Sequence, residues 1–288
     1  MKNICTVSDI NYLTKGLALL DSLCKHTNDV VLHYLCIDKE SHDVLKKHES
    51  DRLIVYNIKN YLESDNNLLR LKNTEYRYFC WSLASYFTNK LLSSGKYSEI
   101  TYIDSDIYFH KSFDLILNEI GDKSVGMFRH RQFPLDANRP EGAFNVGVVY
   151  FKSSKVGLSL CNWWADAVLN KKYPKYATCG DQKYLEYFVS SEGSKEDVYT
   201  DENIGHGAPW LWHIYELTGD GNVIWEGETQ PLIFTHFSQF VDNGNSYIPS
   251  TMHHIYTPLS EYTNNKELKI IYDEYHEALQ SIKNKYKV

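Results

Sequence analysis

Two aspartates, Asp104 and Asp106, follow the apolar run of residues 99–103. Such a run predicts a buried strand, and ligands of open α/β sheets bind beyond the carboxyl ends of strands. A turn at Ser105 would let both carboxylates face one hard cation. Mg²⁺ and Mn²⁺ prefer oxygen ligands and often hold substrate phosphates as well. The alternative is a strand that ends in an ordinary Asx turn.

The opening apolar run, residues 4–7, also ends in polar groups. Thr6, Ser8 and Asp9 lie at its carboxyl end, and Tyr12 follows closely. A nucleotide base could be bound at this strand end. The alternative is a helix cap formed by Ser8 or Asp9, since these residue types are favoured at helix N-termini.

Two later segments carry amides and a carboxylate. Asn145 heads a predicted strand in which Gly147 would allow a ligand or another backbone to approach closely; a β-bulge is the alternative. Asp181 and Gln182 follow Gly180 and could bind sugar hydroxyls. The alternative for Asp181 is a helix N-cap.

His236 ends the apolar run of residues 232–235. An imidazole nitrogen could complete a metal site that already has two carboxylates. The alternative is a histidine satisfied within a loop network.

The elements that must position these residues alternate in the first third of the chain. Strands are expected at 4–7, 30–37, 53–56 and 99–103, and helices at 12–26, 40–48 and 75–92. This order predicts an α/β fold with a mostly parallel central sheet and right-handed crossovers.

The second part is less regular. Further strands are expected at 124–128, 145–151, 223–225 and 232–235, and helices at 155–169, 181–189 and 259–286. One domain is expected over 1–288, with a nucleotide-binding half (1–110), an irregular donor and acceptor half (111–258) and a C-terminal helix (259–288).

Taken in order over residues 1–240, these segments resemble family 8 of the nucleotide-sugar glycosyltransferases, the glycogenin and galactosyltransferase-like group. The resemblance rests on the opening strand, the Asp-x-Asp, the Asn-x-Gly strand, the Asp-Gln pair and the late histidine. It implies a GT-A fold with a Rossmann-like sheet.

The resemblance also implies roles for single residues. Asp104, Asp106 and His236 would hold Mn²⁺ or Mg²⁺, which stabilises charge on the departing nucleotide as a Lewis acid. The residues implied to contact the nucleotide-sugar donor are Thr6, Ser8, Asp9, Tyr12, Arg77, Asp104 and Ser105. The residues implied to face the donor sugar and assist catalysis are Asn145, Asp181 and Gln182.

The chain departs from the family pattern after the late histidine. The family has a lysine there that contacts the diphosphate, whereas His236 is followed by Phe-Ser-Gln-Phe-Val. Arg129, His130 or Arg131 could replace that charge, or could form a solvated turn. The segment 205–210 lies outside the family pattern and resembles a bacterial or viral polysaccharide-assembly branch.

The expected function is transfer of a hexose from a nucleotide-diphosphate sugar, expected to be a UDP-sugar, to a hydroxyl of a glycan or glycoconjugate, with retention of configuration. One alternative is inversion, which needs a carboxylate base such as Asp136, Glu141 or Asp181. Another is a metal-dependent carbohydrate-binding protein without activity. An acceptor platform is expected from aromatic side chains, with core packing as the alternative: Trp210, Trp212, Tyr215, Phe237 and Phe240.

Composition excludes some classes of function. The formal net charge of −7 argues against general nucleic-acid binding, which requires a basic face. The six cysteines form no Cys-x-x-Cys pair and fit a reducing, cytoplasmic compartment. No apolar run approaches the roughly 20 residues of a membrane span, so any membrane association would be peripheral. Donor sugar, acceptor, linkage and oligomeric state are left open.

Overall fold

The computed structural model describes residues 1–131, 139–190, 193–201 and 203–288. These residues form two compact units that interleave along the chain. Unit 1 comprises Met1–Ile10, Asp29–Asp104 and Ile120–Asp201, and unit 2 comprises Asn11–Asn28, Ser105–Glu119 and Glu202–Val288. One boundary between the units therefore falls inside the Asp-x-Asp segment.

Unit 1 is built on a seven-stranded sheet with the order β3-β2-β1-β4-β7-β6-β8. Its strands are β1 (Lys2–Ser8), β2 (Val30–Cys36), β3 (Leu53–Asn57), β4 (Glu99–Ile103), β6 (Val125–Arg129), β7 (Phe144–Lys152) and β8 (Val198–Thr200). Only β7 runs antiparallel to its two neighbours, β4 and β6, and the other pairs are parallel. The predicted mostly parallel sheet is confirmed.

Parallel pairing brings strand ends to one edge of the unit 1 sheet. Every residue of β2 is buried, as expected of an inner parallel strand with both faces covered. The register sets Ser8 opposite Cys36 and Ile4 opposite Thr101. The carboxyl ends of β1 and β4 therefore lie at the same edge.

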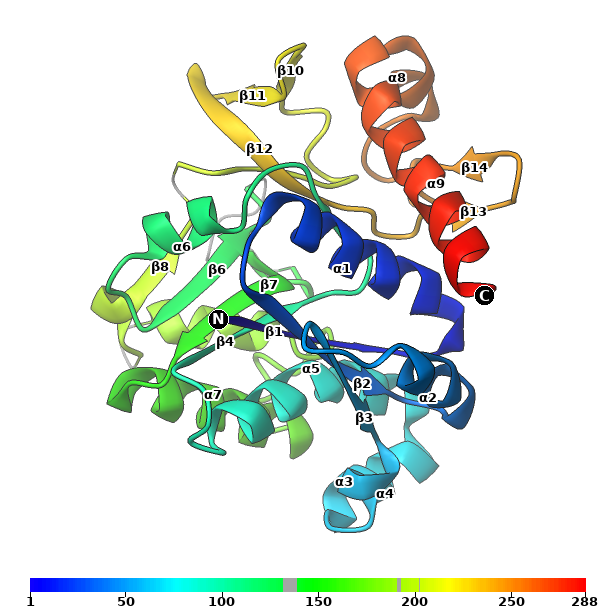
Figure 1. The fold of residues 1–288 in the computed structure, drawn as a ribbon. Helices are drawn as coiled ribbons and strands as arrows, with labels where there is room; N and C mark the ends of the chain where they lie inside the picture. The colour runs from blue at the N-terminus through cyan, green and yellow to red at the C-terminus, as the bar shows by residue number, and fades with distance from the viewer. Residues whose placement is uncertain (132–138, 191–192, 202) are drawn as a thin grey trace. The chain divides into compact units, whose positions relative to one another are not determined.

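Helices α5 (Tyr76–Leu92) and α7 (Lys155–Leu169) lie side by side along one face of this sheet (Figure 1). Trp164 of α7 is fully buried and stacks on Phe151 of β7, with ring centroids 5.8 Å apart. The unit's other helices are α2 (Lys39–Leu45), η2 (Lys46–His48), α3 (Lys59–Leu62), α4 (Asn66–Thr74), η3 (Lys183–Val189) and η4 (Lys195–Asp197).

The segment predicted as a helix over 181–189 is a 3₁₀-helix, η3, that starts at Lys183. Its N-cap residue is Gln182, which makes no capping hydrogen bond through its side chain. The alternative role of Asp181 as a helix N-cap is therefore wrong. Helices α3 and α4 were not predicted, because both are short and α4 is mostly polar.

Unit 2 contains a second sheet, with the order β10-β11-β12-β5, in which β9 also pairs with β12. Its strands are β5 (Ile107–Phe109), β9 (Gly205–Gly207), β10 (Glu216–Thr218), β11 (Asn222–Trp225) and β12 (Glu228–His236), and a separate hairpin is formed by β13 (Val241–Asp242) and β14 (Tyr247–Ile248). Helix α1 (Leu13–His26) is fixed to β5 because Phe109 N donates to Ser22 Oγ over 3.1 Å.

The remaining helices of this unit are η1 (Ile10–Tyr12), which straddles the unit boundary, α6 (Asp114–Ile120), α8 (Leu259–Asn264) and α9 (Lys266–Tyr286). The single helix predicted over 259–286 is therefore two. Asn265 separates them, because its side chain accepts a hydrogen bond from Leu268 N at 3.1 Å and caps α9. None of the helices in the described part of the chain has the length and apolar character to cross a membrane.

The segment 205–210 is explained by packing within unit 2. A Cβ on Gly207 would lie 2.1 Å from the Trp212 ring, so only glycine fits where β9 lies against β12. His206 is buried and its ring stacks on Phe234 at 5.6 Å. The five aromatic residues expected as an acceptor platform are all buried: Trp210, Trp212, Tyr215, Phe237 and Phe240. Core packing, the alternative, accounts for them.

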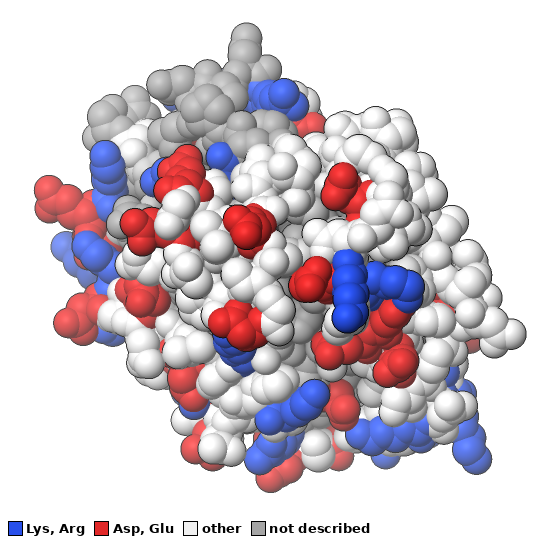
Figure 2. All heavy atoms as spheres, turned by 90° about the horizontal axis from the view of Figure 1, so that it is seen from above, with Lys and Arg blue, Asp and Glu red and all other residues white. Residues whose placement is uncertain are grey.

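Charged side chains of both signs lie close to one another on the face drawn in Figure 2. Acidic residues outnumber basic ones in the chain, 37 to 30. The described residues of that face therefore form no broad basic surface of the kind that binds a nucleic-acid backbone.

Candidate active site

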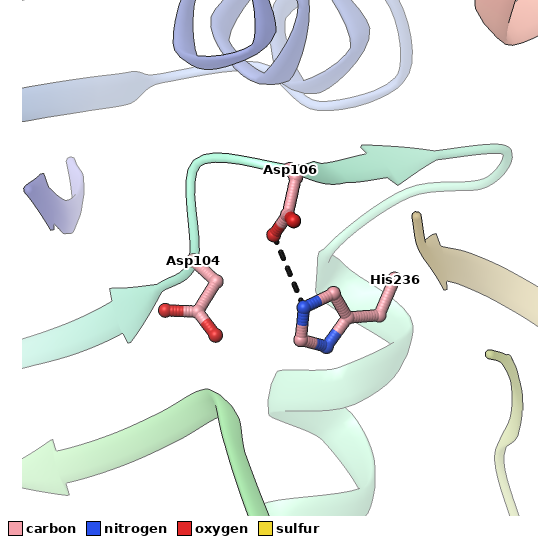
Figure 3. Close-up of side chains that lie close together, drawn as sticks. All are labelled: Asp104, Asp106 and His236. Atoms are coloured by element: carbon pink, nitrogen blue, oxygen red, sulfur yellow. Dashed lines mark ion pairs between the residues drawn. The ribbon is translucent and has the colours of Figure 1, made fainter. Parts of the chain in front are cut away.

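Asp106 and His236 are brought together by the pairing of β5 with β12. The antiparallel register sets His236 opposite Ile107, and Phe237 N donates to the Asp106 carbonyl over 2.9 Å. His236 Nε2 lies 3.1 Å from Asp106 Oδ1 (Figure 3). Both residues are buried, so this contact is largely protected from water.

The surroundings of Asp106 favour the ionised carboxylate. Burial alone would raise its pKa, but His236 and then Lys15 act in the opposite direction and leave the pKa below its ordinary value. The ring of Trp210 meets the His236 imidazole edge-on, with centroids 5.4 Å apart, and limits its rotation. The result is a carboxylate and an imidazole in a defined mutual orientation.

Asp104 is held within unit 1. Its backbone N–H donates to Gly147 O over 2.9 Å, and its Oδ1 accepts from Tyr102 OH at 2.8 Å. Asp104 ends unit 1 and Asp106 lies in unit 2, so the buried Ser105 is the covalent link between them.

Asp104, Asp106 and His236 each offer one ligand atom, and these atoms lie within 4.8 Å of one another (Figure 3). Adjacent ligands of an octahedral ion bound at about 2.1 Å lie about 3 Å apart. The 3.1 Å between His236 Nε2 and Asp106 Oδ1 fits that spacing. Two carboxylates and an imidazole also match the donor preferences of Mn²⁺. These residues fit a hard divalent cation.

Asn145 and Gln182 are joined directly in unit 1. Asn145 Nδ2 donates to Gln182 Oε1 over 3.0 Å, and Gln182 Nε2 donates to Glu141 O over 3.0 Å. Asn145 Oδ1 accepts from Gly147 N at 2.7 Å. Because Gly147 O in turn accepts from Asp104 N, one hydrogen-bonded chain joins Gln182 to Asp104.

His130 belongs to the same network, which sequence reasoning missed. Its Nδ1 is 3.0 Å from Gly142 O and its Nε2 is 3.5 Å from Asn145 Nδ2. A proton on Nδ1 satisfies both contacts, with Nε2 as the acceptor. The sequence signal was present, because His130 follows the predicted strand 124–128 by two residues, but the residue was considered only as a cation.

Asp181, next to Gln182 in the chain, is buried in the interior of unit 1. Burial raises the pKa of its carboxyl well above the ordinary value, and the Asp104 charge raises it further. Its backbone carbonyl accepts from Trp164 Nε1 at 3.0 Å, which fixes its position.

Arg77, predicted to contact the donor, is exposed on α5 with its guanidinium 4.7 Å from the centre of the Trp81 ring. That ring also packs against Gly180, where a Cβ would lie 2.9 Å from it. Gly180 has a φ of +58°, so the turn that leads into Asp181 requires glycine for two reasons. Arg77 and Asp181 thus share one region of unit 1.

The residues predicted around the base differ in their surroundings. Thr6 is fully buried, and the Ser8 hydroxyl is 2.5 Å from Tyr34 OH, so both face the interior of unit 1. Asp9 is half-buried. Tyr12 belongs to unit 2, where Lys15 Nζ lies 4.3 Å from the centre of its ring.

Asp38, which was not among the predicted site residues, binds the backbone just after β1. It accepts from Ile10 N at 2.8 Å and from Ser41 N at 2.7 Å, and so caps α2 as well.

Arg131 was expected either to replace the missing positive charge near the diphosphate or to lie in a solvated turn. Both expectations are wrong for Arg131. The Arg131 side chain is fully buried, and its Nε donates to Asp201 Oδ2 over 2.9 Å. His130 is buried too. Arg129 is exposed, and its Nη2 donates to Thr200 Oγ1 over 3.0 Å. Asp136 lies outside the described residues.

Comparison with solved structures identifies the class of fold. The apo form of mouse xyloside xylosyltransferase 1 aligns with a TM-score of 0.53 at 14% identity, over 86% of this chain and 99% of that one. The galactosyltransferase LgtC, in complex with donor and acceptor sugar analogues, aligns with a TM-score of 0.51 at 15% identity, over 81% and 86%. The fold is that of the GT-A glycosyltransferases.

Sequence comparison identifies the family. Residues 3–189 match the family model for glycosyl transferase family 8. The protein YfnF of Bacillus subtilis (strain 168), described as uncharacterized, is 31% identical over 252 residues, which cover 82% of this chain and 80% of the relative. The chain therefore belongs to glycosyl transferase family 8 and is a glycosyltransferase.

Proposed function

We propose that this glycosyltransferase moves a hexose from a UDP-sugar to a hydroxyl of a glycan or glycoconjugate, with Mn²⁺ or Mg²⁺ bound by Asp104, Asp106 and His236. The observation that carries the proposal is the clustering of these three ligand atoms within 4.8 Å. A nucleotide-sugar donor follows from the glycosyltransferase activity. Uridine as the base, manganese as the metal and a polysaccharide acceptor stay predictions.

When bound, the metal supplies a Lewis acid for the two phosphates of the donor. In the transfer, the bond between the sugar C1 and the β-phosphate oxygen breaks and its electron pair stays on that oxygen. The acceptor oxygen forms the new bond to C1, and its proton passes to the released phosphate. Asp104 and Asp106 contribute by holding the cation through two charges that need no rearrangement during the step.

Asn145 and Gln182 are proposed to bind the donor sugar. Their amide groups are held by each other and by the backbone of Gly147 and Glu141. This bonding fixes their orientation before substrate arrives, which lowers the cost of ordering them during the reaction. Arg77 is proposed to add positive charge on the same side, since it is exposed and stacked on Trp81.

Retention is proposed because Asp181, one of the three acids considered for inversion, is not a ready base. Asp181 is buried with a raised pKa, which favours its neutral form. Glu141 is half-buried, and its backbone carbonyl accepts a hydrogen bond from Gln182 Nε2. The third acid, Asp136, is outside the part of the chain that the structure describes. A released phosphate that accepts the proton makes a carboxylate base unnecessary.

Calorimetric titration with UDP and with GDP tests the proposal, each with Mn²⁺ and again with EDTA. Binding of UDP that requires Mn²⁺ is the expected result. Preference for GDP would reassign the base, and binding that is unchanged by EDTA would contradict the metal site. No nucleotide binding by the folded protein, together with binding of a glycan, would favour the alternative of a carbohydrate-binding protein that lacks activity.

A further inference from the structure

Lys15 is a half-buried cation within unit 2 that no predicted role includes. It lies on α1, and its Nζ donates to the carbonyl oxygen of Phe240 over 3.0 Å. The same ammonium group is 4.3 Å from the centre of the Tyr12 ring. Lysine is seldom buried without a partner, because desolvation of its charge is costly.

The position of Lys15 is tied to the candidate metal ligands through one short turn. Residues 237–240 begin with Phe237, whose N–H donates to Asp106 O, and end with Phe240, whose carbonyl accepts from Lys15. The charges of Lys15 and Asp106 interact strongly enough to act on each other's pKa. Lys15 is therefore a neighbour of Asp106, and the carbonyl of Phe240 takes one of its three N–H donors.

A second polar residue, Tyr275, packs against the same turn, because its ring contacts both Phe237 and Phe240. Tyr275 is fully buried and its ring stacks on Phe237 with centroids 3.8 Å apart, yet its hydroxyl makes no hydrogen bond within the described part of the chain. Charges on Asp106 and Tyr12 act on this hydroxyl. The Tyr275 hydroxyl and the Lys15 ammonium group therefore lie on the same turn, and both are donors that suit a polar ligand with oxygen acceptors.

We propose that Lys15 binds the diphosphate of the nucleotide-sugar donor, beside the cation held at Asp106 and His236. The inference rests on the proposed function. A divalent cation and two carboxylate ligands sum to zero charge, so the diphosphate still needs a positive partner. Lys15 supplies it from the first helix, whereas the segment after His236 contains no basic residue up to Phe240. Its two remaining N–H donors suit phosphate oxygens.

The test compares wild type with Lys15→Met, Lys15→Arg and Lys25→Met. Methionine keeps the unbranched stem, arginine restores the charge, and Lys25 is an exposed lysine on the same helix. Calorimetry measures binding of UDP, inorganic pyrophosphate and uridine, each with Mn²⁺, and circular dichroism confirms that every variant is folded. Pyrophosphate makes the test independent of the base.

Lys15→Met should weaken UDP and pyrophosphate binding about tenfold or more, the loss expected for one charge-assisted hydrogen bond, with uridine binding unchanged. Lys15→Arg should recover part of the affinity, and Lys25→Met should match wild type. If Lys15→Met binds both phosphates as wild type does, the inference is overturned while the proposed function stands. If folded wild type binds neither phosphate, both are overturned.

Discussion

At the scale of single residues, the site depends on donor atoms that are oriented before any ligand binds. Asp106 is held through its own carbonyl and through His236, and Asp104 through Tyr102 and the Gly147 carbonyl. Such support from neighbouring groups keeps ligating side chains in their binding conformation. The local bonding, in addition to the Asp-x-Asp pattern, supports the proposal that these residues bind a metal.

Asp106→Asn tests that conclusion. The amide keeps the shape of the side chain but removes the charge, so Mn²⁺ affinity should fall at least about 100-fold, more than supporting residues usually contribute. Mn²⁺ binding followed by paramagnetic resonance measures the change, and sugar transfer should fall with it. Asp122→Asn, at an exposed aspartate, is the matched control. Full Mn²⁺ affinity in a folded Asp106→Asn protein would remove Asp106 from the site.

At the scale of secondary structure, glycine positions decide how closely elements pack. A Cβ on Gly157, in the first turn of α7, would lie 2.1 Å from the carbonyl oxygen of Lys152 at the end of β7. Backbone atoms cannot yield as a flexible side chain can. The approach of α7 to the sheet, which buries Trp164, therefore requires glycine at this position.

Gly157→Ala should lower the free energy of unfolding by at least about 1–3 kcal/mol, the usual cost of overpacking. Gly219→Ala is the control, because nothing lies within 4 Å of its Cβ position in the turn after β10. That change should be neutral or stabilise by up to about 1 kcal/mol through the unfolded chain. Urea denaturation measures both, and equal effects would contradict the packing argument.

At the scale of the whole molecule, the buried pair of Arg131 and Asp201 couples stability to pH. Burial raises the pKa of Asp201 to about 6 in spite of the opposing charge of Arg131. The pKa in the unfolded chain is about 3.9. The folded protein therefore holds a proton between these values that the unfolded chain has lost, so stability from this group falls as pH rises from about 4 to about 6.

Arg131→Met should make this dependence steeper. Without the arginine the pKa of Asp201 rises further, so the folded protein resists ionisation to a higher pH. The loss in unfolding free energy should be small at pH 4.5, where Asp201 is protonated, and reach about 3–5 kcal/mol at pH 8. Urea denaturation at both values measures it, with Arg70→Met, at an exposed arginine of α4, as control. A penalty independent of pH would show that packing, not charge, explains the pair.

The sequence by itself determined the alternation of strands and helices in the first third of the chain and the strand ends that carry polar groups. Periodicity and turn residues are local, so short-range patterns report them. For the same reason the Asp-x-Asp at the end of β4 and the Asn-x-Gly of β7 could be recognised without coordinates. Their order along the chain also indicated the family that sequence comparison then confirmed.

The tertiary structure decided which distant residues meet. His236 reaches Asp106 because β12 pairs with β5, a short strand without a sequence signal of its own. The Arg131 side chain does not face solvent, because it is buried in an ion pair with Asp201, which lies far along the chain. Lys15 reads as one polar position of an amphipathic helix, and only the fold of unit 2 sets its ammonium group beside Asp106. Burial and charge partners are properties of long-range contacts, which no local pattern records.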